Sequence, residues 1–176
     1  NGAGKSTLIK ILAGATAPDA GQILIDGEES QFETPLAARR KGIAIIHQEM
    51  SLIPSLSVWE NMFLSRRGWV RRSEEIAETR RLINLLGVDI NPTTLCRDLS
   101  VGEMQVVEIA AALRIRSEIL VLDEFTSSLD PLSEKDILEN IKAVSRNKIV
   151  ILSSHKSEPL KYCDKIFQID KKNLIQ

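Results

Sequence analysis

The sequence predicts an α/β fold built around a largely parallel sheet. Short apolar segments rich in Ile, Val and Leu alternate with stretches in which apolar residues recur at helical spacing, which is typical of that class. A composition of 43% hydrophobic and 27% charged residues over 176 positions suits one globular domain with a substantial core. The chain also opens with NGAGKST, which matches the end of a glycine loop that binds phosphate and begins a helix.

The predicted strands are five short runs rich in β-branched residues, at residues 22–27, 42–47, 118–124, 148–155 and 165–170. The predicted core faces of helices are two apolar stripes at helical spacing: Val106, Ile109, Ala110 and Leu113 in one, and Ile137, Leu138, Ile141 and Val144 in the other. Because these strands alternate with helices, the sheet is expected to be largely parallel.

The middle of the chain, residues 49–115, contains no convincing strand. Its strongest helix candidate has Ser73 as the expected N-cap and Gly87 as the expected stop. We interpret this middle part as a helical subdomain that is inserted into an α/β core. Residues 1–48 and 116–176 are expected to form that core.

The charge balance argues against several classes of protein. Lys and Arg number 23 and Asp and Glu number 24, so no basic field indicates nucleic-acid binding and no acidic excess indicates disorder. The run RRGWVRR at residues 66–72 is interpreted as a solvated face without a binding role. The two cysteines, Cys96 and Cys163, lie far apart, which suits a reducing compartment. All apolar runs are far shorter than the roughly 18 residues of a membrane helix.

The glycine loop is incomplete on its N-terminal side. The full pattern reads G-x-x-x-x-G-K-[ST] after a buried strand, and only its Gly4-Lys5-Ser6 end occurs here. A chance glycine turn that caps a helix is the alternative explanation. We expect the sequence to be a fragment, with the leading glycine and the N-terminal strands of the fold upstream of Asn1.

The chemistry of the loop favours phosphate binding. Gly2 and Gly4 allow successive backbone N–H groups to converge, and the helix that begins near Lys5 adds the positive end of its dipole. Lys5 is expected to place its charge against the β- and γ-phosphates of a nucleotide, and the Ser6 hydroxyl is expected to ligate Mg²⁺.

A pair of carboxylates follows a continuous apolar run at residues 119–122, which suits a strand that is covered on both faces. Successive strand residues point to opposite sides, so Asp123 and Glu124 are expected to have different roles. Asp123 is the expected Mg²⁺ ligand, and Glu124 is expected to orient and deprotonate an attacking water. A solvated strand end is the alternative interpretation of this pair.

The segment LSVGEMQ contains a capping box, in which Ser100 and Glu103 cap the helix that follows. Capping alone explains both residues but leaves Gly102 unexplained. Glycine is unfavourable in a helix by up to about 1 kcal/mol, yet it permits the close approach of a phosphate. The segment is therefore predicted to be a second anion-binding surface.

The two histidines are interpreted differently. His47, beside Gln48 at an expected strand end, is expected to be an ordinary hydrogen-bonded or surface residue. His155 follows an apolar strand at its carboxyl end, where α/β sheets place ligand-binding residues. It is the predicted contact to the γ-phosphate.

Together these motifs resemble those of the ATP-binding subunits of ABC transporters, in the same order and over essentially the whole chain. NGAGKST resembles the end of the Walker A motif, LSVGE the signature motif and LVLDE the Walker B motif. HQE around Gln48 resembles the glutamine loop, SSLD ending at Asp130 the D-loop, and His155 the switch histidine. The resemblance implies a P-loop NTPase fold of the ABC ATPase type, with a helical subdomain between the glutamine loop and the signature motif.

The resemblance also implies a site for ATP and Mg²⁺. The implied nucleotide-binding residues are Asn1, Gly2, Ala3, Gly4, Lys5, Ser6, Thr7, Gln48, Asp123, Ser100, Gly102 and Asp130. The implied metal ligands are Ser6, Gln48 and Asp123. The implied catalytic residues are Glu124 and His155.

Two longer stretches, GIAIIHQEMSLIPSLSVWENMFL and LSVGEMQVVEIA, resemble monosaccharide importers of the ribose, galactose and xylose type, in which two cassettes are usually fused. The resemblance implies ATP hydrolysis that powers sugar import, by a peripheral protein at the cytoplasmic face of the cell membrane. The implied partners are a second ATPase cassette, in the same chain or as a dimer, transmembrane permease subunits and, indirectly, a sugar-binding protein. No nucleic acid is implied.

Two alternative functions stay open. A soluble ABC-type ATPase of translation or DNA repair is disfavoured by the balanced charge. A non-hydrolysing regulatory cassette is disfavoured by Glu124 and His155, but Phe125 stands where the family normally has proline. We expect Phe125 to loosen the turn that aims Glu124 and to weaken its geometry without removing the chemistry. Without the upstream strands, the isolated chain is expected to be inactive.

Overall fold

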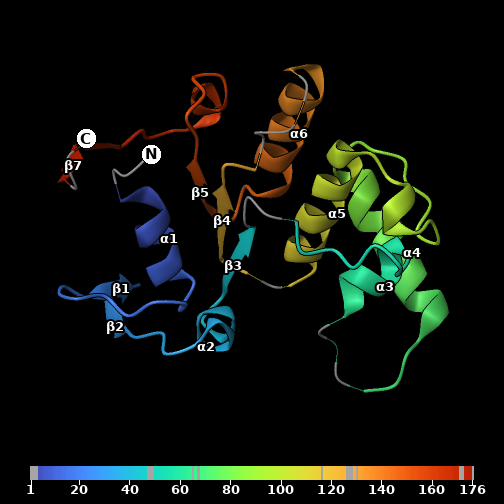
Figure 1. Cartoon of the computed structure of the whole chain (residues 1–176), viewed down its shortest axis with the longest axis horizontal. Helices are drawn as coiled ribbons and strands as arrows, with labels where there is room; N and C mark the ends of the chain where they lie inside the picture. The colour runs from blue at the N-terminus through green and yellow to red at the C-terminus, as the bar shows by residue number, and fades with distance from the viewer. Residues whose placement is uncertain are drawn as a thin grey trace.

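A parallel three-stranded sheet, in the order β3–β4–β5, forms the central layer of the protein (Figure 1). The computed structural model describes residues 4–46, 50–64, 66, 68–115, 117–125, 129, 131–170 and 173–175. The three strands span Ile43–Ile46 (β3), Ile119–Asp123 (β4) and Ile149–Ser153 (β5). The predicted α/β class with a parallel sheet is confirmed.

Helices cover both faces of this sheet. The α-helices are Lys5–Leu12 (α1), Pro35–Arg40 (α2), Val58–Phe63 (α3), Arg72–Leu85 (α4), Val101–Arg114 (α5) and Pro131–Val144 (α6). Two short 3₁₀ helices span Cys96–Asp98 and Pro159–Tyr162. In Figure 1, α1 and α2 lie on one side of the sheet, and α5 and α6 lie on the other.

Alternation along β3 and β4 divides the apolar core into two clusters. Ile43 and Val121 pack with Ile9 of α1 on one face. Ala44 and Leu120 point to the opposite face and join the larger cluster around α5 and α6. The predicted apolar run of β4 is covered on both faces, since its middle residues Leu120, Val121 and Leu122 are all 0% exposed.

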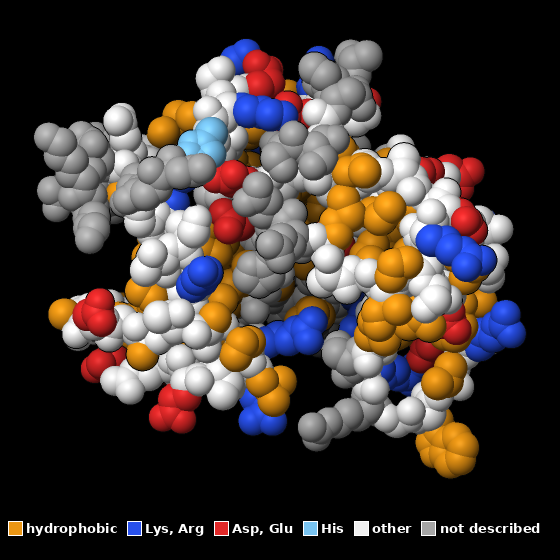
Figure 2. All heavy atoms as spheres, viewed as in Figure 1, with side chains coloured by type: hydrophobic (Ala, Val, Ile, Leu, Met, Phe, Trp, Pro, Cys, Tyr) orange, Lys and Arg blue, Asp and Glu red, His pale blue; other side chains and the backbone are white. Residues whose placement is uncertain are grey.

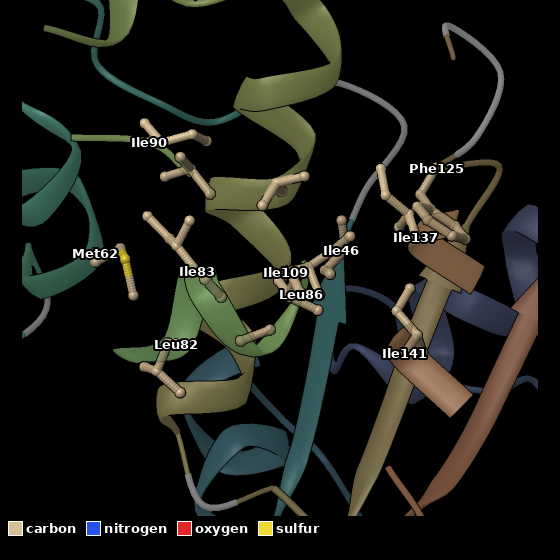
Figure 3. Close-up of a cluster of buried hydrophobic side chains, with 14 of the residues drawn as sticks. Ile46, Met62, Leu82, Ile83, Leu86, Ile90, Ile109, Phe125, Ile137 and Ile141 are labelled. Atoms are coloured by element: carbon tan, nitrogen blue, oxygen red, sulfur yellow. The ribbon is translucent and has the colours of Figure 1, made fainter. Parts of the chain in front are cut away.

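The larger cluster unites the helical middle of the chain with the sheet. Figure 3 shows Ile83 of α4 and Leu86, the residue that follows this helix, near Ile109 of α5 and Ile46 of β3. The predicted stripes on α5 and α6 are confirmed as core faces, because most of their residues are buried. Within the described part of residues 49–115 no strand occurs, only one isolated bridge between Ser57 and Leu95.

Helix α4 ends as predicted but begins differently. Gly87 has φ +74, a left-handed conformation that suits glycine just after a helix. Ser73 as the N-cap is wrong, because the helix begins at Arg72 and Ser73 lies inside its first turn. The carboxylate of Glu75 accepts a hydrogen bond from the Arg71 N–H at 3.4 Å, so an acidic side chain serves the exposed helix end.

Two antiparallel pairs flank the main sheet. Ile23–Ile25 (β1) and Glu28–Ser30 (β2) form a hairpin, and Gln168–Asp170 (β6) pairs with Asn173–Ile175 (β7). Asp26 and Gly27 connect β1 to β2 with φ of 52° and 82°, which is the two-residue turn that Asp-Gly favours. The prediction of one strand at residues 22–27 missed this hairpin. No helix among the described residues is both long and apolar enough to cross a membrane.

Candidate active site at the carboxyl ends of β4 and β5

Asp123 and Glu124 lie where β4 ends, at the edge to which all three parallel strands point (Figure 1). Asp123 is the last residue of the strand, whereas Glu124 already belongs to the turn and has φ +47. The expectation that simple strand alternation separates the two carboxylates is therefore wrong. A left-handed conformation is uncommon for a residue other than glycine, and such backbone strain gathers at functional sites.

His155 faces Glu124 from the segment that follows β5. Its Nε2 lies 2.8 Å from Oε1 of Glu124, with 47% of the histidine side chain and 21% of the glutamate side chain exposed. Figure 2 shows acidic side chains beside the pale blue histidine on an open face of the molecule. The structure thus brings together the two predicted catalytic side chains, and a carboxylate held by an imidazole is suited to accept a proton from water.

Ser153 links the two carboxylates, and sequence analysis assigned it no role. Its hydroxyl donates a hydrogen bond to Oδ1 of Asp123 at 2.5 Å and accepts one from the Glu124 N–H at 3.2 Å. The Ser153 carbonyl accepts a second bond from the same N–H at 3.1 Å. The available signal was the position of Ser153 at the end of a predicted strand, but its pairing with Asp123 depends on the register between β4 and β5.

The N-terminus of α1 begins at Gly4, its N-cap, which has φ +100. Among the described residues, no side chain caps the first turn, and a Cβ added at Gly4 would meet nothing within 4 Å. Ser6 and Thr7 are exposed, and Lys5 is half-buried. Because Ile9 of the same helix packs against Val121, α1 is held directly against β4.

The predicted capping box at the start of α5 is confirmed. Ser100 Oγ accepts from the Glu103 N–H at 3.3 Å, and the Glu103 carboxylate accepts from the Ser100 N–H at 2.8 Å. Gly102 has an additional packing reason, because a Cβ there would lie 3.2 Å from Cδ2 of Leu129. The glycine thus admits the Leu129 side chain, and its predicted role toward a phosphate stays a prediction.

A comparison with protein families identifies the chain. The family described as ABC transporter matches residues 1–127, which include the glycine loop, the capped helix and the β4 carboxylates. The chain belongs to the ABC transporter family. The resemblance that the sequence motifs indicated is thereby confirmed.

Curated relatives of this ABC chain carry the names of sugar importers. It is 44% identical over 165 residues to the Agrobacterium fabrum protein named as ribose/galactose/methyl galactoside import ATP-binding protein 1, covering 91% of this chain and 33% of the relative. It is 40% identical over 174 residues to an arabinose import ATP-binding protein of Rhizobium johnstonii, covering 94% of this chain and 34% of the relative. The chain therefore spans about a third of the length of these relatives.

Solved ABC structures share the fold. A Clostridium perfringens protein, part of the ABC transporter complex cbiONQ, superposes with a TM-score of 0.85 at 26% identity, covering 100% of this chain and 72% of that one. A second match, the ADP conformation of an ATP-binding cassette of an ABC transporter, has a TM-score of 0.84 at 22% identity, covering 99% of this chain and 75% of that one. The fold is that of an ABC ATPase cassette.

Several predicted residues lie outside the part of this ABC chain that the structure describes. They are Asn1, Gly2, Ala3, His47, Gln48 and Asp130. Among the described residues, no group of three or more His, Cys, Asp and Glu side chains forms a metal cluster. The predicted set of Ser6, Gln48 and Asp123 contains only one such residue, so its assignment as a metal site stays a prediction.

The described residues nevertheless fit Mg²⁺ and a nucleotide phosphate. Asp123 and Ser6 offer hard oxygen donors, which Mg²⁺ prefers. The first turn of α1, which no described side chain caps, presents backbone N–H groups and a positive dipole end, which suit a phosphate. When bound, the metal would help to hold the γ-phosphate of the nucleotide, whose phosphorus is the atom that water attacks.

Proposed function

We propose that the chain is an ATP-binding and ATP-hydrolysing cassette of an ABC importer for a sugar. The observation that carries this proposal is the contact of 2.8 Å between Glu124 and His155 at the ends of β4 and β5. A carboxylate and an imidazole oriented toward each other beside a second carboxylate form a suitable site for activating water. The names of the relatives support sugar import as the work that this chemistry drives.

Within the proposed site, each residue has one task. Lys5 neutralises phosphate charge, and the glycine loop from Asn1 to Thr7 supplies backbone N–H groups. Ser6, Gln48 and Asp123 hold Mg²⁺. Glu124 orients the attacking water and takes its proton, and His155 holds Glu124 in place and contacts the γ-phosphate.

A second cassette completes the proposed site. The helix start at Ser100 and Gly102 is exposed or half-buried, and beside the N–H groups that its capping box satisfies it offers the positive end of the α5 dipole to an anion. We place this surface, together with Asp130, against ATP that is bound to the other cassette. Because the relatives are about three times longer than this chain, the second cassette belongs either to the same protein or to a dimer partner.

Further partners follow from the same proposal. Residues 49–115 form the helical subdomain on the α/β core of residues 1–48 and 116–176. The Gln48 segment joins the two parts and links the nucleotide state to a transmembrane permease. The protein sits peripherally at the cytoplasmic face of the membrane, and a sugar-binding protein delivers the substrate. No nucleic acid takes part, in keeping with 23 basic against 24 acidic residues.

Additional strands are proposed to complete the sheet beside β5. Ile149 is 62% exposed, and Val150 and Ile151 are each 37% exposed, although all three are strand residues with apolar side chains. Such a surface is normally covered in a parallel sheet. Strands of the same protein outside the printed sequence are the proposed cover.

The function is tested with the full-length protein that contains this chain, reconstituted with its permease and binding protein in lipid vesicles. Phosphate release should depend on Mg²⁺ and increase when a pentose or hexose is supplied with the binding protein. Stimulation by ribosomes or DNA in place of sugar would support the soluble ATPase alternative. ATP binding without any phosphate release would support the regulatory cassette.

A further inference from the structure

We propose that Ser153 is a positioning residue that sets the orientation of both carboxylates in the active site. The inference rests on the proposed function, because Asp123 and Glu124 matter here as parts of an ATPase site. It assigns a task to a strand residue that lies outside every motif discussed above. Ser153 acts through these two neighbours and has no proposed contact with ATP.

The position of Ser153 follows from the sheet register. β4 and β5 are parallel, and Asp123 and Ser153 are paired as the last residues of the two strands. The Ser153 hydroxyl therefore lies across from the Asp123 carboxylate and donates to Oδ1 at 2.5 Å. A change of register by one residue would turn this hydroxyl to the other face of the sheet.

The direction of each hydrogen bond is fixed by the chemistry of the partners. An ionised carboxylate only accepts, so the hydroxyl proton of Ser153 points to Asp123. The Glu124 N–H only donates, so it binds the oxygen of the same hydroxyl, at 3.2 Å. The hydroxyl of Ser153 thus uses its one proton to bind Asp123 and its oxygen to bind Glu124.

Each bond has a separate consequence. The bond to Oδ1 limits rotation of the Asp123 carboxylate and so would fix the direction in which that carboxylate is offered to a bound Mg²⁺. The bond to the Glu124 N–H adds to the carbonyl bond at 3.1 Å and stabilises the left-handed turn with φ +47. Ser153 therefore couples the metal ligand to the residue that faces His155.

The test compares Ser153→Thr with Ser153→Val in the full-length protein. The two variants have the same shape and both suit a strand, and they differ by a hydroxyl against a methyl group. Binding of a fluorescent ATP analogue is measured with and without Mg²⁺, and Mn²⁺ binding is followed by electron paramagnetic resonance. Phosphate release gives kcat and the Mg²⁺ concentration for half-maximal rate. Ser154→Ala is the matched control, because Ser154 is the neighbouring serine and its hydroxyl accepts from the Lys156 N–H in the loop, at 2.9 Å.

Loss of a hydrogen bond to a charged group changes an equilibrium constant by about tenfold to hundredfold. Ser153→Val should therefore lower the affinity for the metal by that factor. Metal-free nucleotide binding should not change, and Ser153→Thr should remain within about threefold of the parent. Equal metal affinity in the Val and Thr variants would overturn the inference. If Ser153→Val does not fold, Ser153→Ala replaces it in the same comparison. A parent protein that releases no phosphate would contradict the proposed function, whereas the Mn²⁺ comparison would still test Ser153.

Discussion

Glu108 of α5 accepts two hydrogen bonds from Ser51, one from its backbone N–H at 2.6 Å and one from its hydroxyl at 3.0 Å. These bonds tie the segment that follows Gln48 to the same helix that Ser100 caps. Glu108 is buried, with 9% of its surface exposed, so the Ser51 donors stabilise a carboxylate that is largely removed from water. The segment that follows the predicted glutamine loop is therefore connected to the predicted signature helix by one side chain.

Glu108→Ala should lower the free energy of unfolding by about 1 to 3 kcal/mol, because both donors of Ser51 lose their partner. Glu108→Gln should have a smaller effect, since its amide oxygen still accepts. Denaturant unfolding of the full-length protein measures the difference. The control is Glu139→Ala, which removes an exposed ion pair of 3.9 Å with Lys135 and should change stability by less than about 0.5 kcal/mol. Equal stability of Glu108→Ala and this control would contradict the role of the contact.

Glu124→Gln should slow ATP hydrolysis by at least about a hundredfold, because general-base catalysis contributes on the order of 10² to 10⁴ in rate. Binding of Mg-ATP should be as tight as in the parent, since glutamine keeps the size of the side chain and can still accept from His155. Phosphate release and size-exclusion chromatography with ATP measure both properties, and an ATP-bound closed dimer should accumulate. Glu118→Gln, an exposed change just before β4 at its opposite end, is the control. Near-parental turnover by Glu124→Gln would exclude Glu124 as the base.

Asp123→Asn should weaken Mg²⁺-dependent ATP binding in addition to turnover, because it removes the negative charge that the metal requires. Metal-free nucleotide binding should stay close to that of the parent. Calorimetry with and without Mg²⁺ separates this variant from Glu124→Gln, for which only turnover should fall. If both variants lose only turnover, Asp123 is not a ligand of the metal.

Phe125→Pro should destabilise the protein by at least about 3 kcal/mol, a typical loss for removing a buried phenylalanine. The sequence analysis expected Phe125 to loosen the turn that aims Glu124, and that effect on the turn stays a prediction. Phe125 is 2% exposed and packs with Ile137 and Ile141 of α6 (Figure 3). A proline also restricts the residue before it to extended conformations, which conflicts with φ +47 at Glu124.

Thermal unfolding checks this effect, and Phe125→Leu is the conservative comparison, expected to lose less than half as much stability. A Phe125→Pro protein with parental stability and turnover would show that the turn accepts other conformations. With Phe125 in the core, its presence no longer favours a regulatory cassette over an ATPase.

Local signals predicted those parts of the fold whose causes are local. The apolar run of β4 indicated a strand covered on both faces, and the spacing of Ser100 and Glu103 indicated a capped helix. The same spacing in Ser57 and Glu60 marks the capping box of α3, which sequence analysis did not use. The Asp26-Gly27 turn was also readable, because that dipeptide favours a hairpin.

The remaining features depend on contacts between distant segments. Ser153 reaches Asp123 through the register of two strands that are separated by a whole helix, and no local pattern encodes that register. The cap of α4 by Glu75 includes an ion pair with Arg66 across a loop. The left-handed backbone of Glu124 likewise depends on bonds to β5, so its sequence position alone indicated an ordinary strand residue.

The larger hydrophobic cluster continues from α3, α4 and α5 through β3 and β4 to α6 without a break. Close-packed side chains move between a few discrete arrangements, so such a cluster does not deform gradually. The amides of α5 and β4 should therefore share one opening free energy in hydrogen exchange, as a single cooperative unit. A displacement of α3, α4 or α5 would reach Phe125 through this cluster, and Phe125 directly follows Glu124. The cluster can therefore transmit movement of the helical subdomain to the turn that holds Glu124.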